Sequence, residues 1–206
     1  MVGTVQTPIA TNLTIGTNTQ LDTYDRQGAQ QVSESHGRFY NMAYGGNLFT
    51  TSVPGAGVNI PTTLTTLASK FCLLNPYGSG VNMELIRADL NMAAATPVVG
   101  THGFTKSNQT TAGLGTLTSG VINNMNVNGG RTSQINFYTA ATHADTPVWF
   151  YSMFSCSVAS AIATPNFMHM FDGSIIIPPG NCIDWVMSTT GISAVVPQVV
   201  WAEWPI

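Results

Sequence analysis

Short apolar runs separated by turn residues recur along most of the chain. Such runs lie at residues 70–76, 81–92, 146–158, 173–188 and 197–206, and Gly, Pro, Asn and Thr fill the intervals between them. No window keeps apolar residues at i, i+3, i+4 and i+7 between clear caps, so no long helix is predicted. Several short strands with turn signals between them are typical of an antiparallel sandwich or barrel.

The segment 81–92 (VNMELIRADLNM) changes its alternation part-way along. Its apolar residues stand at odd positions up to Leu85 and at even positions from Ala88 onward. One extra residue in a strand moves every later side chain to the other face, so the change of parity predicts a β-bulge. A helix over the same residues is the alternative.

Four other segments complete the predicted sheets. Residues 37–46 are predicted as a strand, and residues 146–158 are apolar on both faces, which predicts a central strand packed on each side. Pro178, Pro179 and Gly180 predict a tight reversal between two strands, because Pro fixes φ and Gly tolerates positive φ. The apolar C-terminal segment 197–206 is expected to be buried.

The N-terminal part of the chain has a different character. Residues 1–27 are polar and without a hydrophobic period, which indicates an extended arm, and residues 28–36 could hold one or two helical turns. A chain of 206 residues fits one β-domain with an arm. We therefore expect an all-β, antiparallel, jelly-roll-like β-sandwich over residues 37–206, preceded by an extended arm over residues 1–36.

The composition is unusual in one respect, the scarcity of charge. Charged residues make up 7% of the chain, against about 25% in typical soluble domains, while the hydrophobic fraction of 44% is ordinary. Nine Met and nineteen aromatic residues stand against six Lys and Arg. Interface cores lose charge and gain Met and aromatics, so the composition favours a surface covered by neighbouring subunits. A neutral, secreted β-domain is the alternative.

Several function classes are disfavoured. The six basic residues are scattered singly rather than gathered into the stripe that nucleic-acid binding requires. No stretch approaches the ~20 apolar residues of a membrane span, and the N-terminus lacks the pattern of a signal peptide. Three cysteines in apolar runs are predicted to be small buried side chains rather than a disulfide framework: Cys72, Cys156 and Cys182.

A search for catalytic and metal motifs gives no strong candidate. His143 and Asp145 are the nearest pair of ligand type, in an expected exposed loop, whereas His36, His102 and His169 stand alone. Glu203, between Trp201 and Trp204, could have a raised pKa or bind sugar, or could simply face solvent or an Arg. No catalytic, cofactor-binding or metal-binding residue is predicted, and no cofactor is expected. Carboxylate pairs of glycosidase type are possible in principle among Glu84, Asp89, Asp172, Asp184 and Glu203.

The order of four motifs is similar to that of a known class of phage protein. These motifs are GRFYNMAY (37–44), LLNPYGSGVNMEL (73–85), FDGSIIIPPGNCIDW (171–185) and WAEWPI (201–206). From about residue 37 to the end, the chain resembles phage structural proteins of the decoration or cement type, which sit on icosahedral heads as jelly-roll trimers. The strand–Pro-Pro-Gly–strand motif is shared with cupins and tumour-necrosis-factor-like trimers, but the cupin metal signature is missing.

The resemblance implies a non-enzymatic role on the outer surface of a virion head, after synthesis in the host cytoplasm. The expected partners are further copies of the chain, as a homotrimer, and the major capsid protein, without nucleic acid or membrane. A tail-fibre or adhesin module that binds host surface carbohydrate is the alternative, with four candidate contact residues: Trp149, Tyr151, Trp201 and Trp204. A jelly-roll enzyme is a third hypothesis, which the missing acid, base and metal spacings disfavour.

Overall fold

The computed structural model divides the chain into two compact units, Met1–Tyr40 and Asn41–Ile206. In the first unit, two short antiparallel pairs are described, β1 (Asn12–Ile15) with β2 (Asn18–Leu21) and β3 (Thr23–Tyr24) with β4 (Gln30–Gln31). The remainder of the proposed helical segment 28–36 lies outside the described residues. The structure describes residues 12–15, 18–21, 23–24, 30–31, 39–53, 55, 57–61, 69–93, 99–108, 114–115, 117–127, 130–143, 145–156, 167–188 and 194–206.

The expected strand over residues 37–46 is wrong, because its described part forms the helix α1 (Tyr40–Tyr44). Two backbone hydrogen bonds close its C-terminal end, from Asn47 N to Met42 O and from Gly46 N to Ala43 O. Gly46 has φ of +70°, so a glycine stands where the left-handed helix cap requires one. Among the described residues, no helix has the length and hydropathy needed to cross a membrane.

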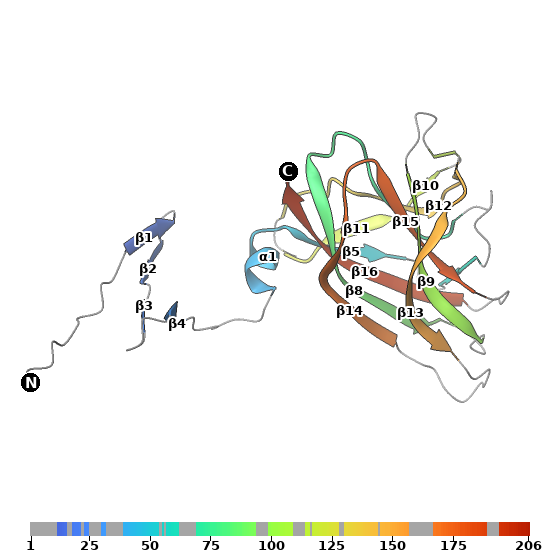
Figure 1. Cartoon of the computed structure of the whole chain (residues 1–206), viewed down its shortest axis with the longest axis horizontal. Coiled ribbons are helices and arrows are strands. Elements are labelled where there is room, and N and C mark those ends of the chain that lie inside the picture. Colours follow the sequence, from blue (N-terminus) through green and yellow to red (C-terminus); the bar gives the residue numbers. More distant parts are fainter. Residues whose placement is uncertain are drawn as a thin grey trace, which may run out of the picture. The chain divides into compact units, whose positions relative to one another are not determined.

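The second unit is a sandwich of two antiparallel sheets (Figure 1). The first sheet has the order β11-β5-β16-β8-β14, and β6 pairs with β16; the second has the order β10-β12-β7-β15-β9-β13. The predicted all-β sandwich is confirmed. The strand bounds are β5 (Leu48–Ser52), β6 (Val58–Asn59), β7 (Cys72–Asn75), β8 (Val81–Met92), β9 (Gly100–Asn108), β10 (Thr118–Ser119), β11 (Val121–Asn124), β12 (Asn136–Ala140), β13 (Val148–Cys156), β14 (Phe167–Ile177), β15 (Asn181–Met187) and β16 (Ala194–Pro205).

Eight of these strands are connected as in a jelly roll. If β5, β7, β8, β9, β13, β14, β15 and β16 are numbered one to eight, the sheets have the orders 1-8-3-6 and 2-7-4-5. Each sheet therefore mixes early and late strands, as two interlocked Greek keys require. Strands β10, β11 and β12 come between the fourth and fifth of these strands and extend the sheets at the end opposite β13 and β14.

The core lies between the sheets and is rich in aromatic side chains. Trp185 of β15 is fully buried and contacts Phe71 and Phe104 edge to face. Trp201 of β16 is also fully buried and stacks on Phe49 of β5. Burial of such large side chains gains roughly 25 cal/mol per Å² of apolar surface, which makes this layer the main source of stability.

The predicted bulge in segment 81–92 is confirmed, and the helical alternative is wrong. Strand β8 pairs with β16 in one register up to Leu85, opposite Trp201, and in another from Arg87, opposite Val200. Ile86 is the extra residue, because it is left without a partner between these two pairs. The bulge keeps apolar side chains directed at the core on both sides of the irregularity.

Strand β13 does not have the central position predicted for residues 146–158. It ends the second sheet, where it pairs only with β9 among the described residues. Two register shifts interrupt this pairing, between Trp149 and Tyr151 and between Ser152 and Phe154. These shifts break the strict alternation, so apolar side chains on both faces here indicate an irregular edge strand rather than a buried central one.

The reversal at Pro178-Pro179-Gly180 is present as predicted and carries the chain from β14 in one sheet to β15 in the other. Gly180 has φ of +83° and donates a backbone hydrogen bond to Asn75 O. The expected burial of the C-terminal segment is confirmed for β16 up to Glu203, since β16 lies between β5 and β8. The last three residues, from Trp204 onward, are exposed.

Candidate functional site

The most distinctive surface of the sandwich is the end where β13 and β14 lie beside each other (Figure 1). Each is the last strand of its sheet in the described part of the chain. Their inward side chains join the two sheets, because Phe154 stacks on Phe167 at 4.6 Å and Tyr151 meets Phe171 edge to face. The Tyr151 hydroxyl also lies 3.0 Å from His169 Nε2.

Several exposed side chains of the same two strands are large and apolar, and they alternate with the exposed polar residues Ser152, Ser155, Asp172 and Ser174. Val148 is 60% exposed and Met168 is 64% exposed, far above the values of ordinary core-forming residues. We use the name apolar edge for six exposed residues of these two edge strands: Val148, Trp149 and Phe150 of β13, and Met168, Met170 and Ile176 of β14.

Strands β13 and β14 have few of the features that prevent an edge strand from pairing with a strand of another chain. Natural edge strands commonly carry Lys or Pro, or are very short, so that they do not pair with another chain. Strands β13 and β14 are 9 and 11 residues long and contain no Lys, Arg, Glu or Pro; their one carboxylate is the exposed Asp172 of β14. The bulges of β13 protect it in part, but its side chains remain suited to contact with another apolar surface.

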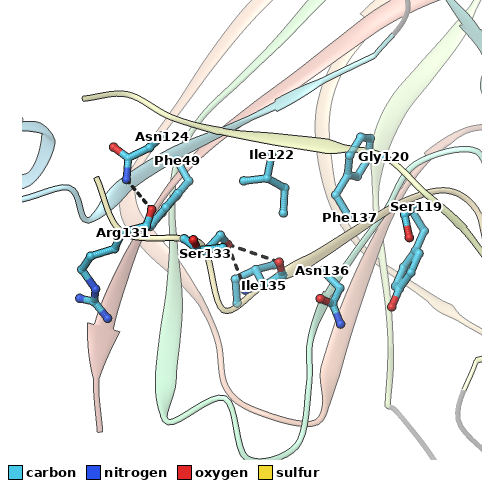
Figure 2. Close-up of a pocket in the computed structure, with 12 residues that line it drawn as sticks. Phe49, Ser119, Gly120, Ile122, Asn124, Arg131, Ser133, Ile135, Asn136 and Phe137 are labelled. Atoms are coloured by element: carbon cyan, nitrogen blue, oxygen red, sulfur yellow. Dashed lines mark hydrogen bonds between the residues drawn. The ribbon is translucent and has the colours of Figure 1, made fainter. Parts of the chain in front are cut away.

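A cavity of about 400 Å³ opens at the opposite end, between β11 and β12 (Figure 2). Phe49, Ile122 and Phe137 are among its apolar residues, and Asn124, Ser133 and Asn136 are among its polar residues. A cavity of this size with mixed lining is the usual form of a small-molecule site.

The polar groups of this cavity are largely engaged within the protein. Asn124 donates hydrogen bonds to Gly46 O and Arg131 O, and its side-chain oxygen accepts one from Asn126 N. The Arg131 guanidinium donates to Asn47 Oδ1 at 2.7 Å and extends away from Ile122 (Figure 2). Ligand recognition requires convergent polar groups that are free to bind, and these groups instead hold the loop that precedes β12.

Glu203 lies inside the protein beside this loop, only 1% exposed, so the expectation that it faces solvent or an Arg is wrong. Its Oε1 accepts hydrogen bonds from Ser133 Oγ and from Trp201 Nε1, and its Oε2 accepts one from Gln134 N. Three donors satisfy the buried carboxylate, which connects the end of β16 to the loop before β12.

A second buried polar group lies on the outer face of the second sheet. The strand register places Asp184 of β15 directly opposite Cys72 of β7 and Thr105 of β9. Cys182, two residues earlier on the same face, lies opposite Ser107 of β9. The segment that follows β12 covers this face through the pairing of Ser69 with Ala141.

His143, on that covering segment, completes what we call the buried polar cluster: Cys72, Ser107, His143, Cys182 and Asp184. His143 Nε2 lies 2.9 Å from Asp184 Oδ1, and Nδ1 lies 3.0 Å from Ser107 Oγ. Cys182 Sγ is 2.8 Å from Ser107 Oγ and 3.9 Å from His143 Nδ1. All five residues are buried.

The charges in the cluster depend on one another. Burial by itself would lower the pKa of His143, but hydrogen bonds to Asp184 and Cys182 outweigh burial and raise it to about 10. The hydrogen bond from Cys72 is the largest influence that lowers the pKa of Cys182, and burial opposes it. The pKa of Cys72 is raised by that same hydrogen bond and by burial. The arrangement favours a protonated His143 imidazole between the Asp184 carboxylate and the Cys182 sulfur.

The structure places His143 and Asp145, the ligand-type pair noted in the sequence, in different surroundings. His143 contacts Asp184 and is buried, whereas Asp145 is exposed, so the expected exposed loop is wrong for His143.

The predicted burial of the three cysteines is confirmed, although Cys72 and Cys182 have polar neighbours. His102 and His169 are hydrogen-bonded within the protein, to Trp185 and Tyr151. His36 lies outside the described residues.

The other proposed contact residues are dispersed. Trp201 is fully buried and Tyr151 is partly buried in the core, which removes both from any exposed sugar-binding surface. Trp149 and Trp204 remain partly exposed. The two most buried candidate carboxylates, Asp184 and Glu203, belong to different sheets.

No family model, no curated protein and no solved structure matches the chain. The residues themselves therefore carry the functional argument. Sequence reasoning missed the buried polar cluster, although one signal was present. Cys182 and Asp184 are two residues apart in a predicted strand, and such a spacing places both side chains on one face.

Proposed function

We propose that this chain is a non-enzymatic structural subunit of a virion, a capsid decoration or cement protein on the outer surface of the head. The exposed side chains of the apolar edge are the observation that carries this proposal. The low charge of the chain and its resemblance to decoration proteins support the same role. The apolar edge would bind a further copy of the chain, and the resemblance favours a trimer that contacts the major capsid protein.

Apolar contact suits a protein that must hold neighbouring subunits together. Each Å² of apolar surface removed from water gains roughly 25 cal/mol, so an interface of about 800 Å² per partner is sufficient for stable association. With six Lys and Arg and nine Asp and Glu in 206 residues, the chain offers little charge to oppose such contact. The polar groups around the cavity are largely engaged within the protein, and the residues of the buried polar cluster are closed off from solvent, which favours a structural role over catalysis.

Mass photometry or light scattering tests the proposal directly. The purified chain is expected to form a stable oligomer and to add at a constant ratio to heads that lack it. The variant Met168→Glu/Met170→Glu places charge on the apolar edge and is expected to dissociate the oligomer. Val127→Glu is the matched control, because Val127 is 95% exposed and follows β11 at the other end of the first sheet.

Each outcome is decisive for the proposal. Loss of the oligomer in the double variant but not in Val127→Glu supports assembly through the apolar edge. A monomeric wild-type chain that does not bind heads contradicts the proposal. In that case, binding of the monomer to a glycan array, abolished by Trp149→Ala, would favour a carbohydrate adhesin.

A further inference from the structure

Four metal-binding side chains of the buried polar cluster come from separate parts of the chain. Cys72 lies on β7, Cys182 and Asp184 lie on β15, and His143 lies on the segment that covers the sheet. One donor atom from each of Cys72, His143 and Asp184 lies within 4.8 Å of the other two. Cys182 Sγ approaches the same imidazole, at 3.9 Å from Nδ1.

The kinds of donor in this group narrow the range of suitable ions. Two thiols, an imidazole and a carboxylate are ligands of zinc and similar borderline cations, whereas magnesium and calcium prefer oxygen alone. Zinc–ligand distances of about 2.0–2.3 Å in a tetrahedron place donor atoms about 3.3–3.8 Å apart. A contraction of roughly one ångström would bring the donors of Cys72, His143 and Asp184 to that separation, and Cys182 Sγ would move from the Nδ1 side of the imidazole to complete the tetrahedron.

An unpartnered oxygen in the cluster points independently to a ligand. Asp184 is completely buried, and its Oδ2 has no hydrogen-bond partner among the described residues. Thr105 Oγ1, on the residue directly opposite Asp184 in β9, is likewise buried and without a partner. Buried polar atoms without partners are uncommon in folded proteins, and a bound ion can supply the partner that such an atom lacks.

Two other roles fit the cluster less well. A disulfide between Cys72 and Cys182 is disfavoured because the two residues are diagonal rather than opposite in the β7–β15 pair. The Cα atoms of diagonal neighbours are about 7–8 Å apart, beyond the usual 4.4–6.8 Å of a disulfide, and Cys72 and Cys182 meet as free thiols joined by a hydrogen bond. Catalysis is disfavoured because Cys182, His143 and Asp184 are all buried and a substrate would have to reach them.

We propose that Cys72, Cys182, His143 and Asp184 bind one zinc ion, or a cation of the same ligand preference, as a structural site. The ion would fasten the segment after β12 to the outer face of the second sheet. Such a site departs from the expectation that the chain holds no metal. Spacing along the sequence indicates only that Cys182 and Asp184 share one face of a strand, because the other two ligands are contributed by separate segments.

Metal analysis of the whole chain is the direct test. The protein is purified, exposed to Zn²⁺ and dialysed against metal-free buffer, and about one zinc per chain is expected by mass spectrometry. With Co²⁺ in place of Zn²⁺, a thiolate-to-cobalt charge-transfer band is expected. Addition of Zn²⁺ should raise the melting temperature of the metal-free chain, because binding to the folded state stabilises it.

Single cysteine variants locate the ion. Cys72→Ser and Cys182→Ser are each expected to weaken zinc binding by more than about 100-fold, since even the loss of an outer partner of a ligand weakens binding 10- to 100-fold. Cys156→Ser is the matched control, because Cys156 is a buried cysteine that lies on β13 and outside the buried polar cluster. It should bind zinc as the wild type does.

Three results would overturn the inference. The first is a folded wild-type chain without zinc, without a change in melting temperature and without a charge-transfer band. The second is zinc binding that survives in both Cys72→Ser and Cys182→Ser, which would place the ion elsewhere. The third is a loss of binding in Cys156→Ser equal to that in the other two variants. The wild-type measurements remain informative even if a variant fails to fold.

Discussion

The Ser133 hydroxyl donates a hydrogen bond to the carboxylate of Glu203, and this bond joins segments 70 residues apart in the chain. Gln134 N and Trp201 Nε1 donate to the same carboxylate. A carboxylate that is 1% exposed must find its partners inside the protein, so the loop before β12 and the end of β16 are fixed to each other.

Removal of this carboxylate should destabilise the sandwich. Glu203→Ala leaves the buried Trp201 Nε1 without its acceptor, and a loss of about 3 kcal/mol in the free energy of unfolding is expected. Glu203→Gln keeps one oxygen acceptor and should lose about half as much. Urea unfolding followed by circular dichroism measures both. Asp145→Asn, at an exposed site, is the control, and an unchanged midpoint for Glu203→Ala would contradict the role.

The strand pattern was predictable because each strand buries its own residues in a local alternation. The bulge at Ile86 and the reversal at Pro178-Pro179-Gly180 follow from a change of parity and from backbone preferences, both of which are local. Strand order is not local. The two apolar faces of β13 result from its bulges at a sheet edge, and nothing within residues 148–156 distinguishes this case from a central strand.

The candidate sites were harder to predict for the same reason. Glu203 meets Ser133 and Gln134 only because β16 lies in the centre of its sheet and the loop before β12 closes over its end. His143 was compared with its sequence neighbour Asp145, whereas folding places it against Asp184, 41 residues away. A polar cluster that forms across paired strands can therefore be predicted only when the register of the pairing is known. That register could not be determined from the sequence alone.

The acid stability of the protein should depend on His102. Burial lowers the pKa of His102 to about 4, and its Nδ1 accepts a hydrogen bond from Trp185 Nε1. The unfolded value is about 6.5, so between pH 6.5 and 4 the unfolded chain binds more protons than the folded one. The free energy of unfolding should fall as the pH is lowered through this window, by about 3 kcal/mol in total.

Urea unfolding at pH 7 and pH 4.5 measures this dependence, with His102→Gln as the comparison. The variant lacks the titrating imidazole, so its difference in stability between the two pH values should be smaller than that of the wild type. Other groups titrate equally in both proteins and do not affect the comparison. The same pH dependence in both would show that His102 does not contribute.

The N-terminal unit should be separable from the sandwich. Because the chain divides into the units Met1–Tyr40 and Asn41–Ile206, deletion of residues 1–38 is expected to leave the melting temperature of the sandwich unchanged. If these residues form an arm that reaches neighbouring subunits, as the polar sequence predicts, the deletion should weaken binding to heads. Differential scanning calorimetry and co-sedimentation with heads measure the two effects. A truncated chain that binds heads normally would contradict the predicted arm.

Gly103 of β9 allows the edge strand β13 to approach closely. Addition of a single Cβ atom at position 103 tests this contact. A Cβ at position 103 would overlap Tyr151 O and would lie 2.5 Å from Cζ2 of Trp149. Both contacts are far inside normal separations, and the first is with backbone that cannot rotate away. Gly103→Ala should therefore displace β13 and lower the free energy of unfolding by about 2 kcal/mol, within the range for overpacked sites.

Gly55→Ala is the control for this substitution, because a Cβ there would meet nothing within 4 Å. Urea unfolding gives the stability of both variants, and hydrogen exchange of the β13 amides shows whether that strand is displaced. Since β13 carries half of the apolar edge, Gly103→Ala should also weaken self-association under the proposed function. A variant as stable as the wild type, with unchanged exchange in β13, would show that the edge strand is not held as closely as the structure indicates.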